Sequence, residues 1–222
     1  MKLNCDLGEG VGCEEAVMPF IDQASIACGA HAGDTELMRT TVALAKEFGV
    51  SIGAHPGYPD RENFGRSSLK YSLQEIEVMV AEQVETLAQF GDVDYVKPHG
   101  ALYHDMMQQE EILQVIRGVI GGRPLMVQAL LETASKDAGL INEVFADRRY
   151  ADNGGLLLRA QSGAVLSEEQ ILEQVGLITK ENVIQSNTGR RMQVMADSIC
   201  VHGDNPAAVS AIEAVRRLLE NG

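Results

Sequence analysis

The sequence predicts a distorted (β/α) barrel of about seven parallel strands that forms one domain over residues 1–222. Three observations predict this fold class. Short apolar runs alternate with helical segments, polar glycine-rich motifs follow nearly every apolar run, and the chain length suits one sizeable core. An open doubly wound sheet is the alternative, but it would bind ligands mainly at one switch point, whereas these motifs follow most strands.

Eight short apolar runs predict strands. They are residues 2–4, 24–28, 51–54, 95–97, 125–128, 143–146, 183–185 and 198–201. Helical segments separate most of these runs. A repeated strand–helix–strand pattern makes a parallel sheet, and at this chain length the sheet closes or nearly closes into a barrel.

A helix is predicted from Ser72, because Ser72 and Glu75 have the spacing of a capping box. Its apolar residues recur at helical intervals on one face, which we expect to pack on the sheet. These residues are Leu73, Ile76, Val80, Val84 and Leu87.

Two further helices have clear boundary signals. One has Asp34 as its N-cap and stops at Gly49, and the last begins at Asn205 and Pro206, a cap followed by a proline in the first turn. The expected inward face of the first of these helices consists of Leu37, Met38, Thr41, Leu44 and Phe48.

The composition disfavours two classes of partner. The chain has 18 Lys and Arg against 32 Asp and Glu, a net charge of −14, so repulsion disfavours nucleic acids and anionic membranes. No run approaches the roughly 18 apolar residues of a membrane helix, and the N-terminus lacks a signal-peptide core. We therefore expect a cytoplasmic protein.

The four cysteines of the chain show no C-x-x-C spacing, which favours buried, reduced residues over a metal site or a disulfide.

Four of the five histidines follow strand-like runs directly. They are His31, His55, His99 and His202. The carboxyl ends of parallel strands share one face of a barrel, so we expect these imidazoles to converge there in a single site. His104 does not follow a strand and is expected to lie outside that site.

The first strand leads into a glycine-rich turn that carries Asp6 and Glu9. Such a turn lets both carboxylates point into the same space, which suits acid–base chemistry or metal binding. It is not a dinucleotide-binding fingerprint, because Cys13 stands where the third glycine is required. The chain also contains no P-loop.

Three later segments bring charged residues to strand ends. His55 is followed by Asp60, Arg61 and Arg66, a mixture that suits a small molecule with a carboxylate. Lys97 ends a strand, where burial would require a charged partner, and Asp6 or Glu9 is the expected one.

The segment after residues 143–146 offers Asp147 and Arg148, which again follow an apolar strand. After the last strand, Asp204 and Asn205 stand at the start of the final helix, where capping is the expected role.

Six motifs, in this order, resemble those of the LamB/YcsF family, the 5-oxoprolinase A subunits. They are N-x-D-x-G-E-G, A-C-G-x-H-A-G-D, G-A-H-P-G-Y-P-D-R-x-x-F-G-R, V-K-P-H-G-A-L-Y, E-V-F-A-D-R-x-Y and C-x-H-G-D, between Leu3 and Asp204. The resemblance implies a barrel related to the glycoside hydrolase/deacetylase superfold. It also implies ATP-dependent opening of 5-oxo-L-proline (pyroglutamate) to L-glutamate, performed with two further subunits of B and C type. One departure is that Leu158 precedes Arg159, where the family usually has proline.

The resemblance suggests roles for the predicted site residues. Asp6 or Glu9 would act as general base, while Lys97 and a histidine would stabilise the developing oxyanion. Arg61 or Arg148 would hold the substrate carboxylate. ATP is required by the complex, but the chain shows no nucleotide motif, so nucleotide chemistry is expected to depend on the partners. The predicted catalytic residues are Asp6, Glu9, His31, His55, Lys97 and His99, and the predicted substrate-binding residues are Asp60, Arg61, Arg66, Asp147, Arg148 and His202.

Two other functions stay open on the sequence alone. A metal-dependent carbohydrate deacetylase or hydrolase of the same superfold would use Asp6, His55 and His99 as metal ligands, with an open position for water. A non-catalytic binding subunit is the third possibility. The identity of any metal is not fixed by the sequence.

Overall fold

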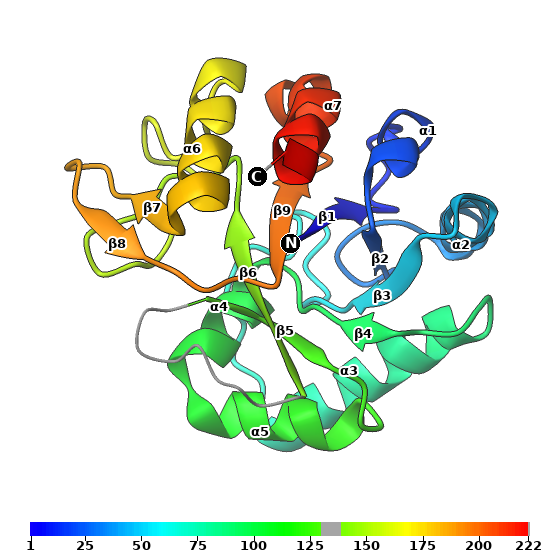
Figure 1. Cartoon of the computed structure of the whole chain (residues 1–222). Helices are drawn as coiled ribbons and strands as arrows, with labels where there is room; N and C mark the ends of the chain where they lie inside the picture. The colour runs from blue at the N-terminus through cyan, green and yellow to red at the C-terminus, as the bar shows by residue number, and fades with distance from the viewer. Residues whose placement is uncertain (130–138, 222) are drawn as a thin grey trace.

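The computed structural model, which describes residues 1–129 and 139–221, is a closed barrel of seven parallel strands surrounded by helices (Figure 1). The strand order is β1-β2-β3-β4-β5-β6-β9, and β9 closes the barrel by pairing with both β6 and β1. The predicted barrel of about seven parallel strands is therefore confirmed. The barrel strands are β1 (Lys2–Leu7), β2 (Gln23–Ala27), β3 (Ser51–His55), β4 (Tyr95–Val96), β5 (Leu125–Gln128), β6 (Leu140–Phe145) and β9 (Ser198–His202).

Helices cover the outside of the barrel, with α3 beside α5 and α6 beside α7 (Figure 1). In the ranges that the structure describes, no helix combines the length and apolarity needed to cross a bilayer. The helices are α1 (Glu14–Val17), the 3-10 turn η1 (Met18–Phe20), α2 (Thr35–Phe48), α3 (Leu73–Ala88), α4 (Gly100–Gln108), α5 (Glu110–Val119), α6 (Glu168–Glu181) and α7 (Pro206–Asn221).

One predicted strand lies outside the barrel. Residues Val183–Gln185 form β7, which pairs antiparallel with β8 (Arg191–Gln193) beside α6 (Figure 1). Strand β8 was not predicted from the sequence, because its three residues alternate exposed, buried and exposed and include a single apolar side chain. The extra hairpin leaves the seven-strand closure unchanged.

The predicted helix boundaries are confirmed by their caps. The Asp34 side chain accepts a hydrogen bond from the Leu37 N–H, and Gly49 ends α2 in the left-handed conformation, with φ of 67°. Ser72 and Glu75 form the reciprocal bonds of a capping box at the start of α3. These bonds satisfy backbone groups that a helix end leaves unpaired.

Two residues of the predicted inward faces are exposed instead. Leu73 is 43% exposed and Phe48 is 46% exposed, because each lies at an end of its helix, in the first turn of α3 and the last turn of α2. The buried positions of α2 are Met38, Thr41, Val42 and Ala45. The four cysteines, Cys5, Cys13, Cys28 and Cys200, are buried and free.

The interior of the barrel is polar near the start of the strands. Asn4 and Asp6 are two residues apart on β1, so both side chains point to the same face. The amide of Asn4 donates to the Ser198 hydroxyl at 2.8 Å, and that hydroxyl donates to Gln23 at 2.9 Å. All of these groups are buried. Hydrogen bonds across the barrel therefore offset the cost of desolvating them.

A glycine makes room for an aromatic ring next to this network. Gly53 on β3 lies against Tyr95, whose hydroxyl bonds to Ser25 at 3.0 Å. A Cβ atom at position 53 would lie 2.2 Å from the Tyr95 ring. The rigid ring and the two paired strands leave little freedom to relieve that contact.

We therefore expect Gly53→Ala to lower the free energy of unfolding by about 1–3 kcal/mol, the usual cost of overpacking a core. Urea denaturation followed by circular dichroism measures it. Gly118→Ala is the matched control: Gly118 lies in α5 with open space around its Cβ position, so the change should stabilise by about 0.5–1 kcal/mol. Equal stability of the two variants would contradict this description of the barrel interior.

Candidate functional site

The four histidines that end strand-like runs lie at one end of the barrel with Asp6 and Glu9. Glu9 Oε1 lies 3.4 Å from His31 Nε2, 3.7 Å from His55 Nε2 and 3.2 Å from His99 Nδ1. Asp6 Oδ2 lies 3.5 Å from His55 Nε2 and 3.9 Å from His202 Nε2. The predicted convergence is confirmed, and His104 lies outside it, bonded to Gln108 on α4.

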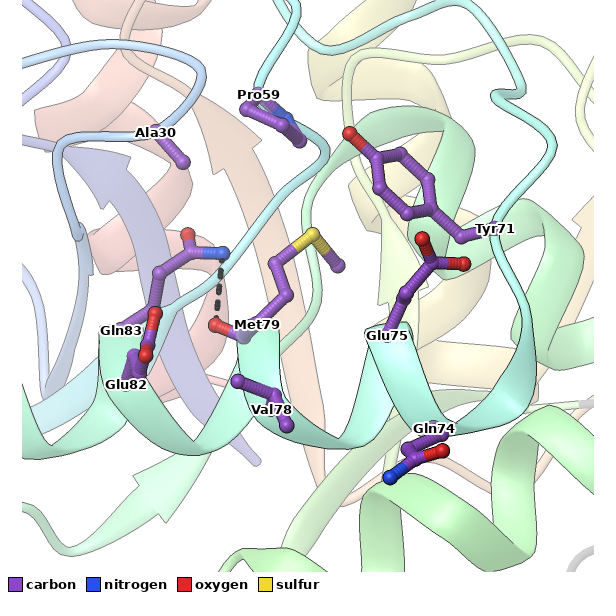
Figure 2. A pocket seen from close by; sticks show the side chains of 9 residues that line it. All are labelled: Ala30, Pro59, Tyr71, Gln74, Glu75, Val78, Met79, Glu82 and Gln83. Carbon is purple, nitrogen blue, oxygen red and sulfur yellow. Dashed lines mark hydrogen bonds between the residues drawn. The ribbon is translucent and has the colours of Figure 1, made fainter.

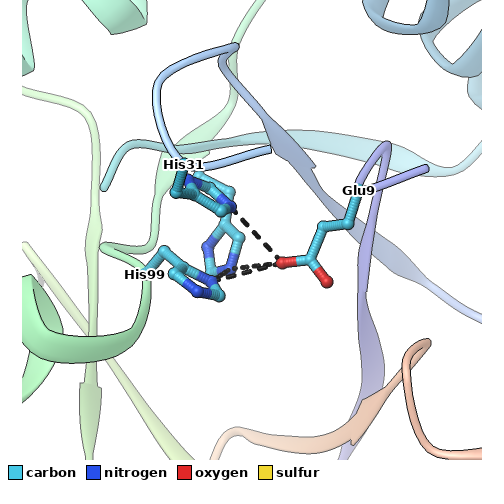
Figure 3. A group of neighbouring side chains, drawn as sticks. Glu9, His31 and His99 are labelled. Carbon is cyan, nitrogen blue, oxygen red and sulfur yellow. Dashed lines mark hydrogen bonds and ion pairs between the residues drawn. The ribbon is translucent and has the colours of Figure 1, made fainter. Parts of the chain in front are cut away.

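The carboxylate of Glu9 faces the first group of histidines from one side (Figure 3). The rings of His31 and His99 are stacked, with centroids 3.8 Å apart and an angle of 5° between their planes, and both point to the Glu9 carboxylate. His55 meets each of the other two rings edge-on. The packing of the rings on one another leaves a ring nitrogen of each near the same carboxylate oxygen.

Burial and charge set the protonation states in this group. Desolvation lowers the pKa of His31 to about 4 and that of His55 to about 3, so both imidazoles are neutral near pH 7. Burial opposes ionisation of Glu9, but its pKa lies well below the ordinary value when the facing nitrogens of His31 and His99 carry the proton. The Glu9 carboxylate thus faces the neutral rings of His31 and His55.

Lys97, directly after β4, is buried deeper in the barrel and is only 2% exposed. Its Nζ lies 2.8 Å from Asp6 Oδ1, 3.1 Å from Glu143 Oε2 and 3.1 Å from Cys200 Sγ, and it donates to Asn4 Oδ1 at 3.1 Å. The expected pairing of Lys97 with a carboxylate of the first turn is confirmed for Asp6. The ammonium group therefore links β4 to β1, β6 and β9.

The two carboxylates beside Lys97 respond differently to burial. Burial opposes ionisation of Asp6, but its pKa is held well below the usual range by His55, which carries a proton in the acid range where Asp6 titrates, and by the charge of Lys97. Burial raises the pKa of Glu143 above its usual value, although Lys97 partly offsets this. Burial also opposes the charge on Lys97, but Asp6 keeps the pKa of its ammonium well above the usual value.

Glu143 was not among the site residues predicted from the sequence. It is the single acidic residue of β6, whose other residues apart from Asn142 are apolar, and it is fully buried. An acid in that position requires a cation or a proton, which is the signal that could have identified it.

His202 at the end of β9 is oriented by a buried carboxylate. Its Nδ1 bonds to Asp147 Oδ1 at 2.8 Å, and Asn205 donates to the other oxygen of Asp147 at 2.9 Å. Burial opposes ionisation of Asp147, but His202 and the hydrogen bonds hold its pKa below the ordinary value. The ionised Asp147 fixes the His202 tautomer and leaves Nε2 facing Asp6.

Two arginines meet one carboxylate near His202. Arg66, from the loop after β3, and Arg159, from the loop after β6, each bind an oxygen of Asp204 at 2.5 Å. The Arg66 side chain is 36% exposed. Two guanidinium groups on one carboxylate leave a net positive charge, so this place suits an anion. Arg159 was not among the predicted substrate-binding residues.

Three other predicted binding residues have partners inside the protein. Arg61 donates to the carbonyl oxygens of Gly29 and Gly33, and Arg148 donates to those of Leu157 and Ala164. Asp60 accepts from the side chain and the backbone of Asn63. These contacts favour a role in holding loop shape for Arg61, Arg148 and Asp60.

Two supports hold the loop after β3 against the histidines. Gly57 packs so closely that a Cβ atom there would lie 2.7 Å from His31 Nδ1. The Gln83 amide pairs with both the N–H and the carbonyl of Gly57. Gln83 also borders a groove of about 570 Å³ between α3 and the loops that carry Ala30 and Pro59 (Figure 2). None of the four histidines lines this groove.

Two groups in the described ranges have ligand atoms close enough for one metal ion. Glu9 forms one with His31, His55 and His99, and Asp6 forms the other with Cys200 and His202. The sequence had suggested the combination of Asp6, His55 and His99. In the structure, the ring nitrogens of His55 and His99 are within 3.7 Å of Glu9, while one oxygen of Asp6 is bonded to Lys97.

Known proteins resemble this chain along its whole length. The sequence profile of the LamB/YcsF family matches residues 1–222. A Vibrio campbellii protein, named as the A subunit of 5-oxoprolinase, is 45% identical over 100% of this chain and 96% of the relative. The crystal structure of a lactam utilization protein from Thermus thermophilus has a TM-score of 0.86 and 31% identity, covering 100% of this chain and 96% of that one. A family 4 carbohydrate esterase from Streptomyces lividans shares the fold alone, with a TM-score of 0.53 and 12% identity over 100% of this chain and 88% of that one.

We expect Lys97→Met to lower the free energy of unfolding by about 3–5 kcal/mol, because Asp6 and Glu143 lose their common cation. Adding Glu143→Gln removes one of these carboxylates and should recover part of the loss. Urea denaturation at pH 7 measures both variants. Lys180→Met, at an exposed position in the last turn of α6, should change stability by no more than about 0.5 kcal/mol. A similarly small effect of Lys97→Met would contradict the conclusion that the ion pairs of Lys97 with Asp6 and Glu143 stabilise the barrel.

Proposed function

The chain belongs to the LamB/YcsF family, and from this we propose that it is the A subunit of a cytoplasmic, ATP-dependent 5-oxoprolinase. The enzyme would open 5-oxo-L-proline to L-glutamate together with B- and C-type subunits. Its support is the 45% identity, over the whole chain, to a protein named as the A subunit of 5-oxoprolinase. The 31% identity to a lactam utilization protein agrees with a cyclic amide as substrate.

The chemistry of the substrate explains the need for ATP. A lactam is a stable amide, and phosphorylation of its oxygen makes the ring carbon more reactive. Water then adds to that carbon, the C–N bond breaks, and the ring nitrogen takes up a proton as it becomes the amine. A second water cleaves the resulting acyl phosphate to a carboxylate and inorganic phosphate. This chain would perform the ring opening, while its partners bind the nucleotide.

The observation that carries the proposed chemistry is the pair formed by His202 and Asp147. Asp147 holds the His202 N–H at Nδ1, so Nε2 is free to accept a proton from water and to return it to the leaving nitrogen. His202 is also partly open to solvent, with 15% of its side chain exposed. From the sequence, both residues were expected to bind substrate, and Asp6 or Glu9 was the favoured base.

Lys97 acts on this site through Asp6 in our proposal. The ammonium group is bonded to Asp6 and Asn4 inside the barrel, and its side chain is buried. It therefore holds the Asp6 carboxylate in place beside His202. The other oxygen of Asp6 can accept a hydrogen bond from water or, once His202 Nε2 has taken up a proton, from that nitrogen. Lys97 is then a positioning residue rather than the oxyanion donor suggested by the sequence.

The substrate carboxylate is assigned to Arg66 and Arg159. They share the single charge of Asp204, so one positive charge is left for an anionic ligand. Both arginines come from loops at the same end of the barrel as His202. Arg61 and Arg148 are less suitable, because their guanidinium groups already bind backbone carbonyls.

The purified chain alone should not turn over 5-oxoproline, and adding the B- and C-type subunits should produce ATP-dependent release of glutamate. In that complex, His202→Gln should lower the rate by about 10²–10⁴-fold, the usual contribution of a general acid–base group. Asp147→Asn should also lower it, because His202 then loses its fixed tautomer.

His104→Gln is the control, since His104 lies on the outer helix α4. It should leave the rate unchanged. Full activity of the isolated chain would refute the division of labour among subunits. An unchanged rate in a folded His202→Gln complex would instead show that His202 does not transfer the proton.

In the same assay, Arg159→Gln should raise KM for 5-oxoproline by about tenfold or more and change kcat less. A hydrogen bond to a charged group contributes about 1.5–3 kcal/mol, and about 1.4 kcal/mol corresponds to tenfold. Arg39→Gln on the exposed face of α2 is the control and should leave KM unchanged. A fall in kcat with constant KM would remove Arg159 from substrate binding.

A further inference from the structure

The geometry points to a metal site that the proposed function does not include. We propose that Glu9 Oε1, His31 Nε2, His55 Nε2 and His99 Nδ1 bind one divalent transition-metal ion of the zinc class. The four atoms come from the ends of β1, β2, β3 and β4 and lie within 4.8 Å of one another (Figure 3).

Hydrogen bonds at the outer ring nitrogens fix two of the imidazoles. His55 Nδ1 lies 2.6 Å from the Lys97 carbonyl oxygen, and His99 Nε2 lies 2.9 Å from the Phe64 carbonyl oxygen. A carbonyl oxygen only accepts, so the proton of each neutral ring must be on that outer nitrogen. The inner nitrogens, His55 Nε2 and His99 Nδ1, therefore both present lone pairs.

These two lone pairs face each other at 2.9 Å, and the Glu9 carboxylate faces them both. Three acceptors without a hydrogen between them repel one another. A positive ion among them removes the repulsion, and the same arrangement of outer carbonyls is the usual support of histidine ligands. His31 adds a fourth buried nitrogen that has no hydrogen-bond partner.

The distances from Glu9 Oε1 to the three ring nitrogens agree with a tetrahedral ion. Metal–ligand distances of about 2.0–2.1 Å place neighbouring tetrahedral ligands about 3.3–3.4 Å apart. Glu9 lies 3.4, 3.7 and 3.2 Å from His31, His55 and His99. Imidazole nitrogens with one carboxylate favour zinc and similar transition metals over magnesium or calcium, which prefer oxygen ligands.

The second group of metal-ligand residue types is a poor site by comparison. Lys97 Nζ lies 2.8 Å from Asp6 and 3.1 Å from Cys200 Sγ. A metal ion among Asp6, Cys200 and His202 would be repelled by this ammonium group. Only this second group contains a cysteine, so a thiolate ligand distinguishes it from the group of Glu9 and the three histidines.

The ion would fasten four loops of the barrel end to one another. Four protein ligands fill a tetrahedral site, which is typical of structural zinc rather than of zinc that keeps a place for water. Metal binding does not depend on the proposed 5-oxoprolinase activity. Failure of one proposal therefore leaves the other standing.

To test this site, the full-length chain is first stripped of metal with a chelator. It is then titrated with Zn²⁺ in competition with a chromophoric chelator, which measures the stoichiometry and the affinity of binding. We expect one equivalent to bind and the thermal midpoint to rise, because the ion binds the folded form. Co²⁺ should give the intense visible bands of tetrahedral nitrogen and oxygen coordination, without the near-ultraviolet charge-transfer band of a thiolate ligand. Such a thiolate band would assign the ion to Cys200 and overturn the proposal.

Two variants and two controls complete the test. Glu9→Gln and His31→Gln should each weaken Zn²⁺ binding by about a hundredfold or more. Loss of a residue that only hydrogen-bonds to a metal ligand already costs about 10–100-fold. His202→Gln and His104→Gln should bind Zn²⁺ like the wild type. Circular dichroism confirms folding, and Glu9→Gln, which keeps the shape of the side chain, serves if His31→Gln does not fold. The proposal fails if the folded wild-type chain does not bind one equivalent of Zn²⁺, since a proton shared among these side chains then takes the place of the ion. It also fails if the Glu9→Gln variant binds Zn²⁺ as tightly as the wild type.

Discussion

A buried ammonium group organises the inside of this barrel. Lys97 lies within 3.1 Å of carboxylates from two other strands, Asp6 on β1 and Glu143 on β6. Removing such charges from water costs several kcal/mol per ion unless partners compensate them in good geometry. The residue types on β1 and β6 are therefore constrained by a lysine at the end of β4. Because Asp6 also lies beside His55 and His202, the interaction that stabilises the interior also places the chemistry.

Polar groups become more accessible from the interior to the end of the barrel. Lys97 is 2% exposed, the His202 side chain is 15% exposed, and that of Arg66 is 36% exposed. Charges in the low-dielectric interior interact strongly and move little, whereas those near solvent can exchange protons and bind anions. This gradient separates groups that hold the site from groups able to meet a substrate. It is the reason for assigning proton transfer to His202 and not to Lys97 or Glu143.

Local signals and the parallel topology made much of this arrangement predictable. Asp34, Gly49 and the Ser72–Glu75 pair mark helix ends through bonds within a few residues, and strands that run in one direction bring their terminal histidines to one face. Partners across the barrel were harder to predict. Arg61 turns to backbone carbonyls while Arg159 reaches Asp204, and only the paths of distant loops decide this. The short strand β8 was not predicted for another reason, because three residues with one buried side chain are too few to show a periodic pattern.

The partner of the second ring nitrogen distinguishes the histidines at these strand ends. Backbone carbonyls hold the outer N–H groups of His55 and His99, so their lone pairs are fixed toward Glu9. His202 instead bonds to the ionised Asp147, which holds the N–H at Nδ1 and leaves the Nε2 lone pair on the side of the ring that is partly open to solvent. Similar sequence settings thus yield rings suited to a metal ion and one ring suited to proton transfer, and the difference lies in the hydrogen bond on the far side of each ring.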